Sequence, residues 1–167
     1  MKGAAGRRAQ PRPAAVAAVI PAHNEAEHLP ACLGAALDQH PDGIVVADGA
    51  GDDDTIAVTR AMGVEVVALP VARRSRQMNA GAAACSSDVL LFLGADSRLP
   101  AGALARIGRL LAEHPQVLGG CFSLRLSDGI GDPRPAAAGE AGAARTLAAA
   151  AAPTATTAAS AAAAGGE

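Results

Sequence analysis

Short apolar runs alternate with amphipathic segments from Ala14 to about Leu126, as strands alternate with helices in α/β folds. The apolar runs predict strands at Val16–Ile20, Ile44–Ala47, Glu65–Leu69, Val89–Leu93 and Cys121–Leu126. The segments between them predict helices at Ala26–Gln39, Asp53–Met62, Ser75–Ala84 and Pro100–His114. This order predicts a mostly parallel sheet with helices on both faces and right-handed crossovers.

Three residues at element ends support these boundaries. Asn24 is expected to be the N-cap of the first helix, because its side chain can accept a hydrogen bond from the first turn. Gly63 is expected to end the second helix, and Pro100 is expected to open the last one.

The two ends of the chain differ from this alternating region. Residues 1–13 are mostly Arg, Gly, Ala and Pro, and we expect them to be disordered. Residues 136–167 contain 18 alanines in 32 positions, and Leu147 is the one large apolar residue there that could dock a helix. We interpret residues 14–126 as the folded domain and residues 127–167 as a low-complexity tail, disordered or weakly helical.

Composition narrows the functional classes. The net charge of −2 over 167 residues gives no reason to expect a nucleic-acid partner, and the basic N-terminus is interpreted as a solvated tail. Cys32, Cys85 and Cys121 have no metal-type spacing, so we interpret them as small buried residues in a reducing, cytoplasmic compartment. No apolar run reaches about 18 residues, so no membrane span is predicted. The run Ala14–Ala22 is too short and alanine-rich for a signal peptide.

Polar residues follow each of the first four predicted strands. In a parallel sheet the carboxyl ends of these strands meet at one edge, where ligands of such sheets bind. Carboxylates there could accept hydrogen bonds from a base or ribose, arginines could pair with phosphate, and an aspartate could hold a divalent cation. The groups concerned are Pro21–Glu25, Asp48–Thr55, Arg73–Asn79 and Gly94–Ser97.

Each group also has a plain structural interpretation. Asn24 and Glu25 fit a helix cap and a first-turn acid, Asp48 and Gly49 fit a turn, and the arginines fit a solvated face. Asp96 fits an exposed loop or the cap of the next helix. Sequence motifs of serine hydrolases, P-loop enzymes and dinucleotide-binding domains are absent, which weakens those three readings.

Taken in order, five segments resemble those of family 2 glycosyltransferases of the GT-A fold, a Rossmann-like α/β architecture. The segment Val19–Glu25, ending in Pro-Ala-His-Asn-Glu, resembles the family's opening, and Val45–Thr55 resembles its second motif. Arg74–Gly81 is similar to the segment before the family's metal strand, and Val89–Ser97 is similar to the metal strand itself. Gly119–Phe122 resembles the start of the acceptor side. The Arg-Gln-Met-Asn-Ala-Gly string is similar to that of a bacterial subgroup.

The resemblance implies a nucleotide-sugar donor and an inverting transfer to an acceptor of unknown identity, a lipid or a glycan. A lipid acceptor would imply peripheral association with the inner face of the cell membrane. Pro21, Glu25 and Asp48 would line the base and ribose pocket, and Asn24 would belong to the same substrate-binding turn.

The resemblance also implies a diphosphate and metal side of the site. Arg74, with Gln77 and Asn79, would face the diphosphate, and Asp96 would bind Mg²⁺ or Mn²⁺ through the diphosphate oxygens. The usual Asp-x-Asp has Gly94 in its first position, which leaves Asp96 as the single metal aspartate.

Two alternatives remain open at this stage. Downstream of Phe122, the acids Asp128, Asp132 and Glu140 lie in no recognisable acceptor motif, so no catalytic base is assigned. The chain could therefore be a truncated, non-catalytic remnant that still binds nucleotide. A sugar-phosphate nucleotidyltransferase shares the architecture, but Pro21–Glu25 is not the glycine-rich loop such an enzyme would carry after its first strand.

Overall fold

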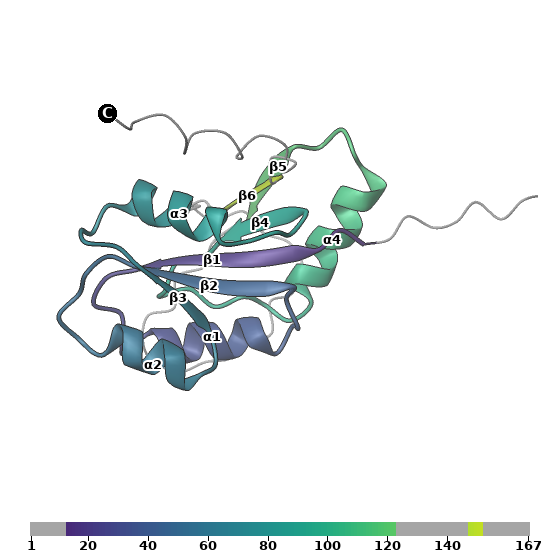
Figure 1. Ribbon diagram of the computed structural model, residues 1–167. Helices are drawn as coiled ribbons and strands as arrows, with labels where there is room; N and C mark the ends of the chain where they lie inside the picture. The colour runs from purple at the N-terminus through teal and green to yellow at the C-terminus, as the bar shows by residue number, and fades with distance from the viewer. Residues whose placement is uncertain (1–12, 123–146, 152–167) are drawn as a thin grey trace, which may run out of the picture.

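The computed structural model describes residues 13–122 and 147–151, and Figure 1 shows its strands and helices in the predicted alternation. The strands are β1 (Val16–Ala22), β2 (Gly43–Asp48), β3 (Glu65–Ala68), β4 (Val89–Phe92), β5 (Gly119–Phe122) and β6 (Leu147–Ala151). The helices are α1 (Leu29–Leu37), α2 (Thr55–Ala61), α3 (Arg74–Ala83) and α4 (Ala103–Glu113).

The strands form one sheet in the order β3-β2-β1-β4-β6-β5. β1 pairs in parallel with β2 and β4, and β2 pairs in parallel with β3. β6 runs antiparallel to both β4 and β5. The predicted mostly parallel sheet is therefore confirmed, and the carboxyl ends of β1, β2, β3 and β4 meet at one edge.

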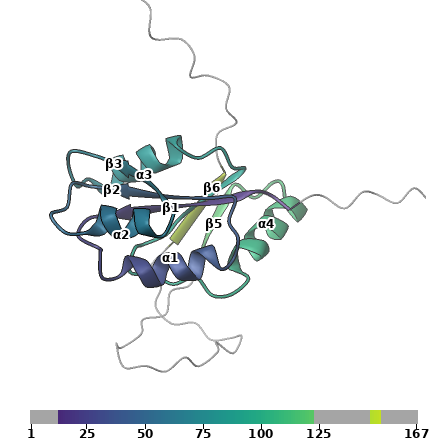
Figure 2. The same cartoon turned by 60° about the horizontal axis from the view of Figure 1, so that its bottom comes forward.

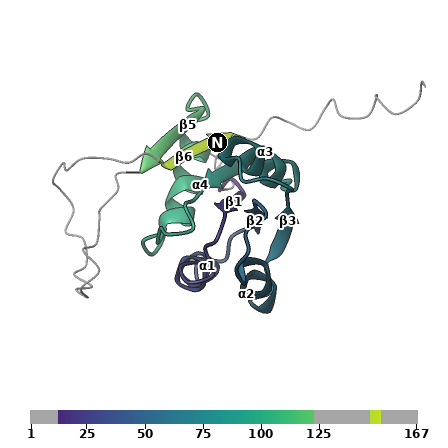
Figure 3. The ribbon, with the colours of Figure 1, turned by 90° about the vertical axis from the view of Figure 1, so that its left-hand side faces the viewer.

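Alternate residues of the central strands face two different hydrophobic layers, as the two-residue period of a strand requires. Ile20 of β1 lies in the larger core, with Leu33 of α1 and Leu104 of α4. Val19 and Leu90 lie in a smaller cluster on the other face, which α3 covers. Figures 2 and 3 show α3 on the opposite side of the sheet from α1 and α2. Helices thus cover both faces, as predicted.

Helix α3 lies unusually close to the sheet at Gly81. A Cβ atom at this position would overlap Cγ1 of Val19. The glycine of the Arg-Gln-Met-Asn-Ala-Gly segment therefore lets the helix backbone approach β1, which brings the start of α3 close to the strand ends.

The first helix begins later than predicted. α1 starts at Leu29 with His28 at its N-cap, so the expected cap by Asn24 is wrong. Asn24 has a φ of 57°, and its side chain instead accepts a hydrogen bond from the main-chain N–H of Asp52. Gly63 has a φ of 74° just after α2, so the predicted helix stop at this glycine is confirmed.

The alanine-rich segment contains a strand that the sequence did not predict. The backbone of β6 fills the place between β4 and β5, with Leu91 opposite Ala149 and Cys121 opposite Ala148. Alanine favours a helix when taken alone, but two neighbouring strand edges offer its backbone hydrogen-bond partners. The other predictions for the two ends of the chain concern residues outside the described part, namely 1–12, 123–146 and 152–167.

Candidate functional site

The candidate site is the edge of the sheet at which β1, β2 and β4 end. In the β1–β2 register Ala22 is opposite Asp48, so the loops that follow both strands begin side by side. β4 pairs with β1 from the other side, and Leu93, directly after β4, donates its main-chain N–H to Val19. The register thus brings three of the predicted polar segments to one edge.

The loops after β1 and β2 are joined by side-chain to main-chain hydrogen bonds. Asn24 Oδ1 accepts from Asp52 N at 2.9 Å, and Asp53 Oδ2 accepts from Ala26 N at 2.9 Å. Thr55 Oγ1 accepts from the main-chain N–H of Glu25 at 2.8 Å. These bonds tie the two loops into one unit.

The same unit explains two local properties. A side chain at Gly51 would overlap Oδ1 of Asn24, so only glycine fits against this turn. The pKa of Asp53 is lowered, first by its hydrogen bond with Thr55 and then by the N–H of Ala26. Its carboxylate is therefore held in the charged form that accepts both bonds.

Asp48 lies at the centre of this edge and is buried, with 1% of its surface exposed. Its Oδ2 accepts a hydrogen bond from Ala50 N at 3.0 Å. Its Oδ1 is buried and has no hydrogen-bond partner among the described residues. A buried acceptor without a partner costs about 1–3 kcal/mol, so a ligand that supplies a donor here would recover that energy. Pro21, one residue before the end of β1, is also buried and pairs with Ala47.

Glu25 and His23 follow β1 and are more accessible. The Glu25 carboxylate is 29% exposed, and its Oε2 lies 3.1 Å from Nδ1 of His28. The Nδ1 atom of His23 lies 3.1 Å from the carbonyl oxygen of Gly49, to which it donates when protonated. The His23 side chain therefore contacts the loop that follows Asp48, whereas the Glu25 carboxylate contacts the start of α1.

The predicted diphosphate residues of α3 separate into two groups. Arg74 and Asn79 are exposed, as is Arg76 between them. Gln77 is buried, and its Nε2 donates to the carbonyl oxygens of Ala22 at 2.6 Å and Ala47 at 3.1 Å. Its amide hydrogens are thus used within the protein, whereas the two arginines point their charge to solvent.

Asp96 is exposed in the turn after β4. Its Oδ1 accepts a hydrogen bond from the hydroxyl of Ser97 at 3.2 Å. A Cβ at Gly94 would come within 2.7 Å of that same oxygen. The glycine therefore removes a second carboxylate and also makes room for the Asp96 carboxylate to fold back over the turn.

The buried thiol of Cys32 connects α1 to this turn. Its Sγ donates to the carbonyl oxygen of Gly94 at 3.5 Å. Burial raises the pKa of Cys32 to about 12, and the charges of Asp96 and Glu25 contribute in the same direction. Both carboxylates therefore favour the protonated form of this one thiol.

Metal binding at this edge would depend on Asp96. Within residues 13–122 and 147–151, no group of three or more His, Cys, Asp or Glu side chains is arranged to hold a metal ion. A cation held by Asp96 would thus need further oxygen ligands, which a diphosphate can supply.

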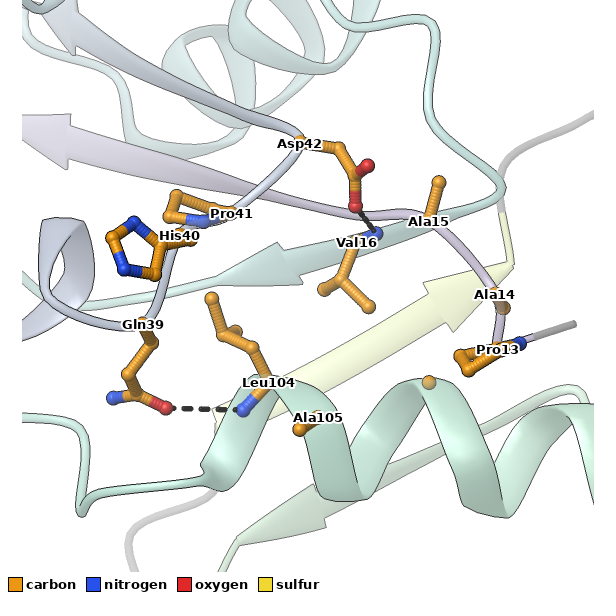
Figure 4. Close-up of a pocket in the computed structure, with 11 residues that line it drawn as sticks. Pro13, Ala14, Ala15, Val16, Gln39, His40, Pro41, Asp42, Leu104 and Ala105 are labelled. Carbon is orange, nitrogen blue, oxygen red and sulfur yellow. Dashed lines mark hydrogen bonds between the residues drawn. The ribbon is translucent and has the colours of Figure 1, made fainter.

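One hollow of the described surface lies away from this edge. A pocket of about 260 Å³ opens at the opposite edge, where β1 begins and α1 ends (Figure 4). There Asp42 Oδ2 accepts from Val16 N at 2.7 Å and Gln39 Oε1 accepts from Leu104 N at 3.2 Å. These polar groups already have hydrogen-bond partners within the protein. We therefore place the candidate site at the carboxyl edge, where Oδ1 of Asp48 has no partner among the described residues.

The sequence analysis placed Thr55 at this edge without assigning it a role, and it missed Cys32. Thr55 has 1% of its surface exposed and Cys32 also 1%, yet each makes a hydrogen bond that orients a site loop. A buried threonine at a helix start was the available signal for the first. The partner of Cys32 lies 62 residues away, and no local pattern indicates it.

No helix in the described part of the chain is long and apolar enough to span a membrane. No curated protein sequence matches this chain.

Solved structures share its fold. S. aureus TarS 1–349 in complex with UDP-GlcNAc superimposes with a TM-score of 0.62 at 16% identity, over 71% of this chain and 37% of that chain. The mannosyltransferase PcManGT from Pyrobaculum calidifontis, in complex with GDP-Man and Mn²⁺, superimposes with a TM-score of 0.58 at 20% identity, over 68% and 36%. Glucosyl-3-phosphoglycerate synthase of M. tuberculosis gives 0.51 at 23% identity, over 64% and 43%. This chain therefore spans less than half the length of each.

The sequence itself matches the family model described as glycosyl transferase family 2 over residues 17–149. That range begins at the second residue of β1, includes β2 to β5 and all the candidate site residues, and continues into β6. The match covers most of the chain, so the protein belongs to glycosyl transferase family 2.

Proposed function

We propose that this chain binds the nucleotide-sugar donor of a glycosyltransferase at the carboxyl edge of its sheet. The observation that carries the proposal is the buried, unpartnered Oδ1 of Asp48, which faces no donor among the described residues. Membership of family 2 supports a nucleotide-sugar as the ligand. TarS and PcManGT, which share the fold, are complexed with UDP-GlcNAc and GDP-Man.

The nucleoside would bind between the loops after β1 and β2. Asp48 Oδ1 would accept a hydrogen bond from an N–H of the base or a hydroxyl of the ribose. Pro21 and Glu25 would line the same pocket. Because Asn24 and Thr55 already join the two loops, little ordering is required when the ligand binds.

The diphosphate would lie toward the start of α3 and the turn after β4. Arg74 and Asn79 are exposed there and free to reach a phosphate oxygen. Arginine suits this role because its planar guanidinium forms paired hydrogen bonds with phosphate.

Asp96 would hold a divalent cation, Mg²⁺ or Mn²⁺, together with oxygens of the diphosphate. Its exposed carboxylate has the hard oxygen ligands that both ions prefer, and its hydrogen bond to Ser97 limits its rotation. When bound, such a cation supplies charge neutralisation for the departing nucleoside diphosphate. PcManGT is crystallised with Mn²⁺.

Transfer of the sugar would require an acceptor hydroxyl and a base on the opposite face of the sugar ring. The acceptor, a lipid or a glycan, and the inverting outcome are parts of this proposal. The acids Asp128, Asp132 and Glu140 lie outside the described residues, and no catalytic base is assigned.

The test is calorimetric titration of UDP-, GDP- and dTDP-sugars with and without Mn²⁺. We expect one class to bind the wild type more tightly in Mn²⁺. Asp96→Asn should lose about 2 kcal/mol of that binding, the scale of removing a charged partner, and should match the wild type in EDTA. Asp38→Asn, an exposed carboxylate at the end of α1, serves as the control and should change neither. Absence of binding by every nucleotide-sugar would refute the proposal.

A further inference from the structure

The side chain of Gln77 is buried under the ends of two strands, with 4% of its surface exposed. Its Nε2 donates to the carbonyl oxygen of Ala22, the last residue of β1, and to that of Ala47 in β2. Ala47 directly precedes Asp48, and Ala22 is opposite Asp48 in the register. One amide group from α3 therefore bridges the two strands at the residue that carries the unpartnered carboxylate oxygen.

The chain after Asp48 passes directly over this amide group. A Cβ at Gly49 would lie 2.9 Å from Nε2 of Gln77 and 2.7 Å from Cα of Ala72. The main-chain N–H of Gly49 also donates to the carbonyl oxygen of Ala22 at 2.9 Å, so this oxygen receives two donors. The turn that follows β2 is thus held by one of the two acceptors of Gln77, the carbonyl oxygen of Ala22.

That turn determines where the Asp48 carboxylate points. The main-chain N–H of Ala50, the second residue after Asp48, donates to its Oδ2. With Oδ2 held by the turn, Oδ1 is left as the buried oxygen that has no hydrogen-bond partner among the described residues. Any shift of Gly49 and Ala50 would rotate the carboxylate and move Oδ1.

We propose that Gln77 is a positioning residue for nucleoside binding: by bridging Ala22 and Ala47 it holds the turn that orients Asp48. The inference rests on the proposed function, because it assumes that a nucleoside binds Oδ1 of Asp48. It assigns Gln77 to the support of the base and ribose pocket, in place of a direct contact with the diphosphate.

The chemistry of the site favours glutamine at this position. Only a side-chain amide offers two hydrogens from one nitrogen to two carbonyl acceptors while remaining uncharged. Asparagine is one methylene shorter and would not span the same distance from α3. Methionine has a similar volume but no hydrogen to donate.

The chain contains a matched control at the opposite edge of the sheet. Gln39 also bonds the main chain twice. Its Nε2 donates to the carbonyl oxygen of Ala35. Its Oε1 accepts from the N–H of Leu104, a bond that Figure 4 shows. Gln77→Met and Gln39→Met therefore each remove two hydrogen bonds between a side-chain amide and the main chain, and only Gln77→Met removes them beside Asp48.

The experiment measures two quantities on the full chain for each variant. The first is amide hydrogen exchange at Gly49 and Ala50 without ligand. The second is the affinity for the nucleotide-sugar that binds the wild type. For Gln77→Met we expect exchange at these two amides to rise about tenfold and affinity to fall about tenfold, the scale of losing a buried hydrogen bond. Gln39→Met should change neither quantity by more than about twofold.

The outcomes separate the two proposals. Unchanged exchange at Gly49 and Ala50 in folded Gln77→Met would overturn the positioning role. An equal loss of affinity in Gln77→Met and Gln39→Met would also overturn the positioning role. Faster exchange in Gln77→Met, in a chain whose wild type binds no nucleotide-sugar, would support the bridge but refute the proposed function. If Gln77→Met does not fold, Gln77→Asn replaces it, and wild-type exchange in that shorter variant would overturn the role.

Discussion

Replacing Asp48 with asparagine should stabilise the free protein and weaken its binding of nucleotide. The substitution keeps the size of the side chain and can keep one of its two contacts. The amide oxygen of the new residue can accept the hydrogen bond that Ala50 N donates to Oδ2. The NH₂ group then occupies the place of Oδ1, which has no partner in the described part of the protein.

The two effects have opposite signs because they act on different states. In the free protein, a buried carboxylate is replaced by a neutral amide, whose lower desolvation cost outweighs its own unpaired NH₂ group, and the net gain is about 1 kcal/mol. For a domain of this size that raises Tm by about 2–6 °C. In the complex, a donor would face the ligand's donor, and the lost charge-assisted hydrogen bond is worth about 1.5–3 kcal/mol. The dissociation constant should therefore rise about 10- to 150-fold.

Thermal unfolding followed by circular dichroism measures the first effect, and calorimetric titration with and without Mn²⁺ measures the second. Asp42→Asn is the control, because Asp42 is exposed and its carboxylate already accepts from Val16 N at the other edge. A lower Tm for Asp48→Asn, with unchanged affinity, would show that Asp48 is a structural carboxylate. A loss of affinity seen only in Mn²⁺ would move Asp48 to the metal site.

Two further predictions concern packing around the site. Because burial raises the pKa of Cys32 from 9.0 to about 12, the folded state keeps its proton where the unfolded chain releases it. Between pH 9 and 12 the free energy of unfolding of the wild type should therefore fall relative to that of Cys32→Ser, by up to about 1.4 kcal/mol per pH unit. Urea unfolding at a series of pH values measures this difference, and parallel pH curves for the two proteins would contradict it. Gly81→Ala should destabilise the protein by about 1–3 kcal/mol because its Cβ would overlap Val19. Gly34→Ala, a helical glycine with open space around it, should stabilise by about 1 kcal/mol, and equal Tm shifts for the two would refute the packing argument.

The sequence predicted where the candidate site lies but not which contacts its residues make. The strand ends predicted which segments meet, because the direction of parallel strands places all their carboxyl ends at one edge. The sequence did not predict the structural role of each residue at that edge. Gln77 and Asp96 were both predicted to face the diphosphate and its metal, yet Gln77 is buried under two strand ends and Asp96 is exposed. Burial depends on how α3 packs, and Gly81 allows that packing without leaving any periodic signal.

The sequence by itself determined the order of strands and helices from β1 to α4, the covered faces of the central strands and the stop at Gly63. These features follow from periodicity and backbone preferences within about ten neighbouring residues. Only the tertiary structure decided that β6 completes the sheet, that Asn24 bonds the next loop and that Gln77 bridges two strands. The partners of Asn24 and Gln77 lie 28 to 55 residues away in the chain. The register of the sheet brings them together, and a single local pattern carries no information about that register.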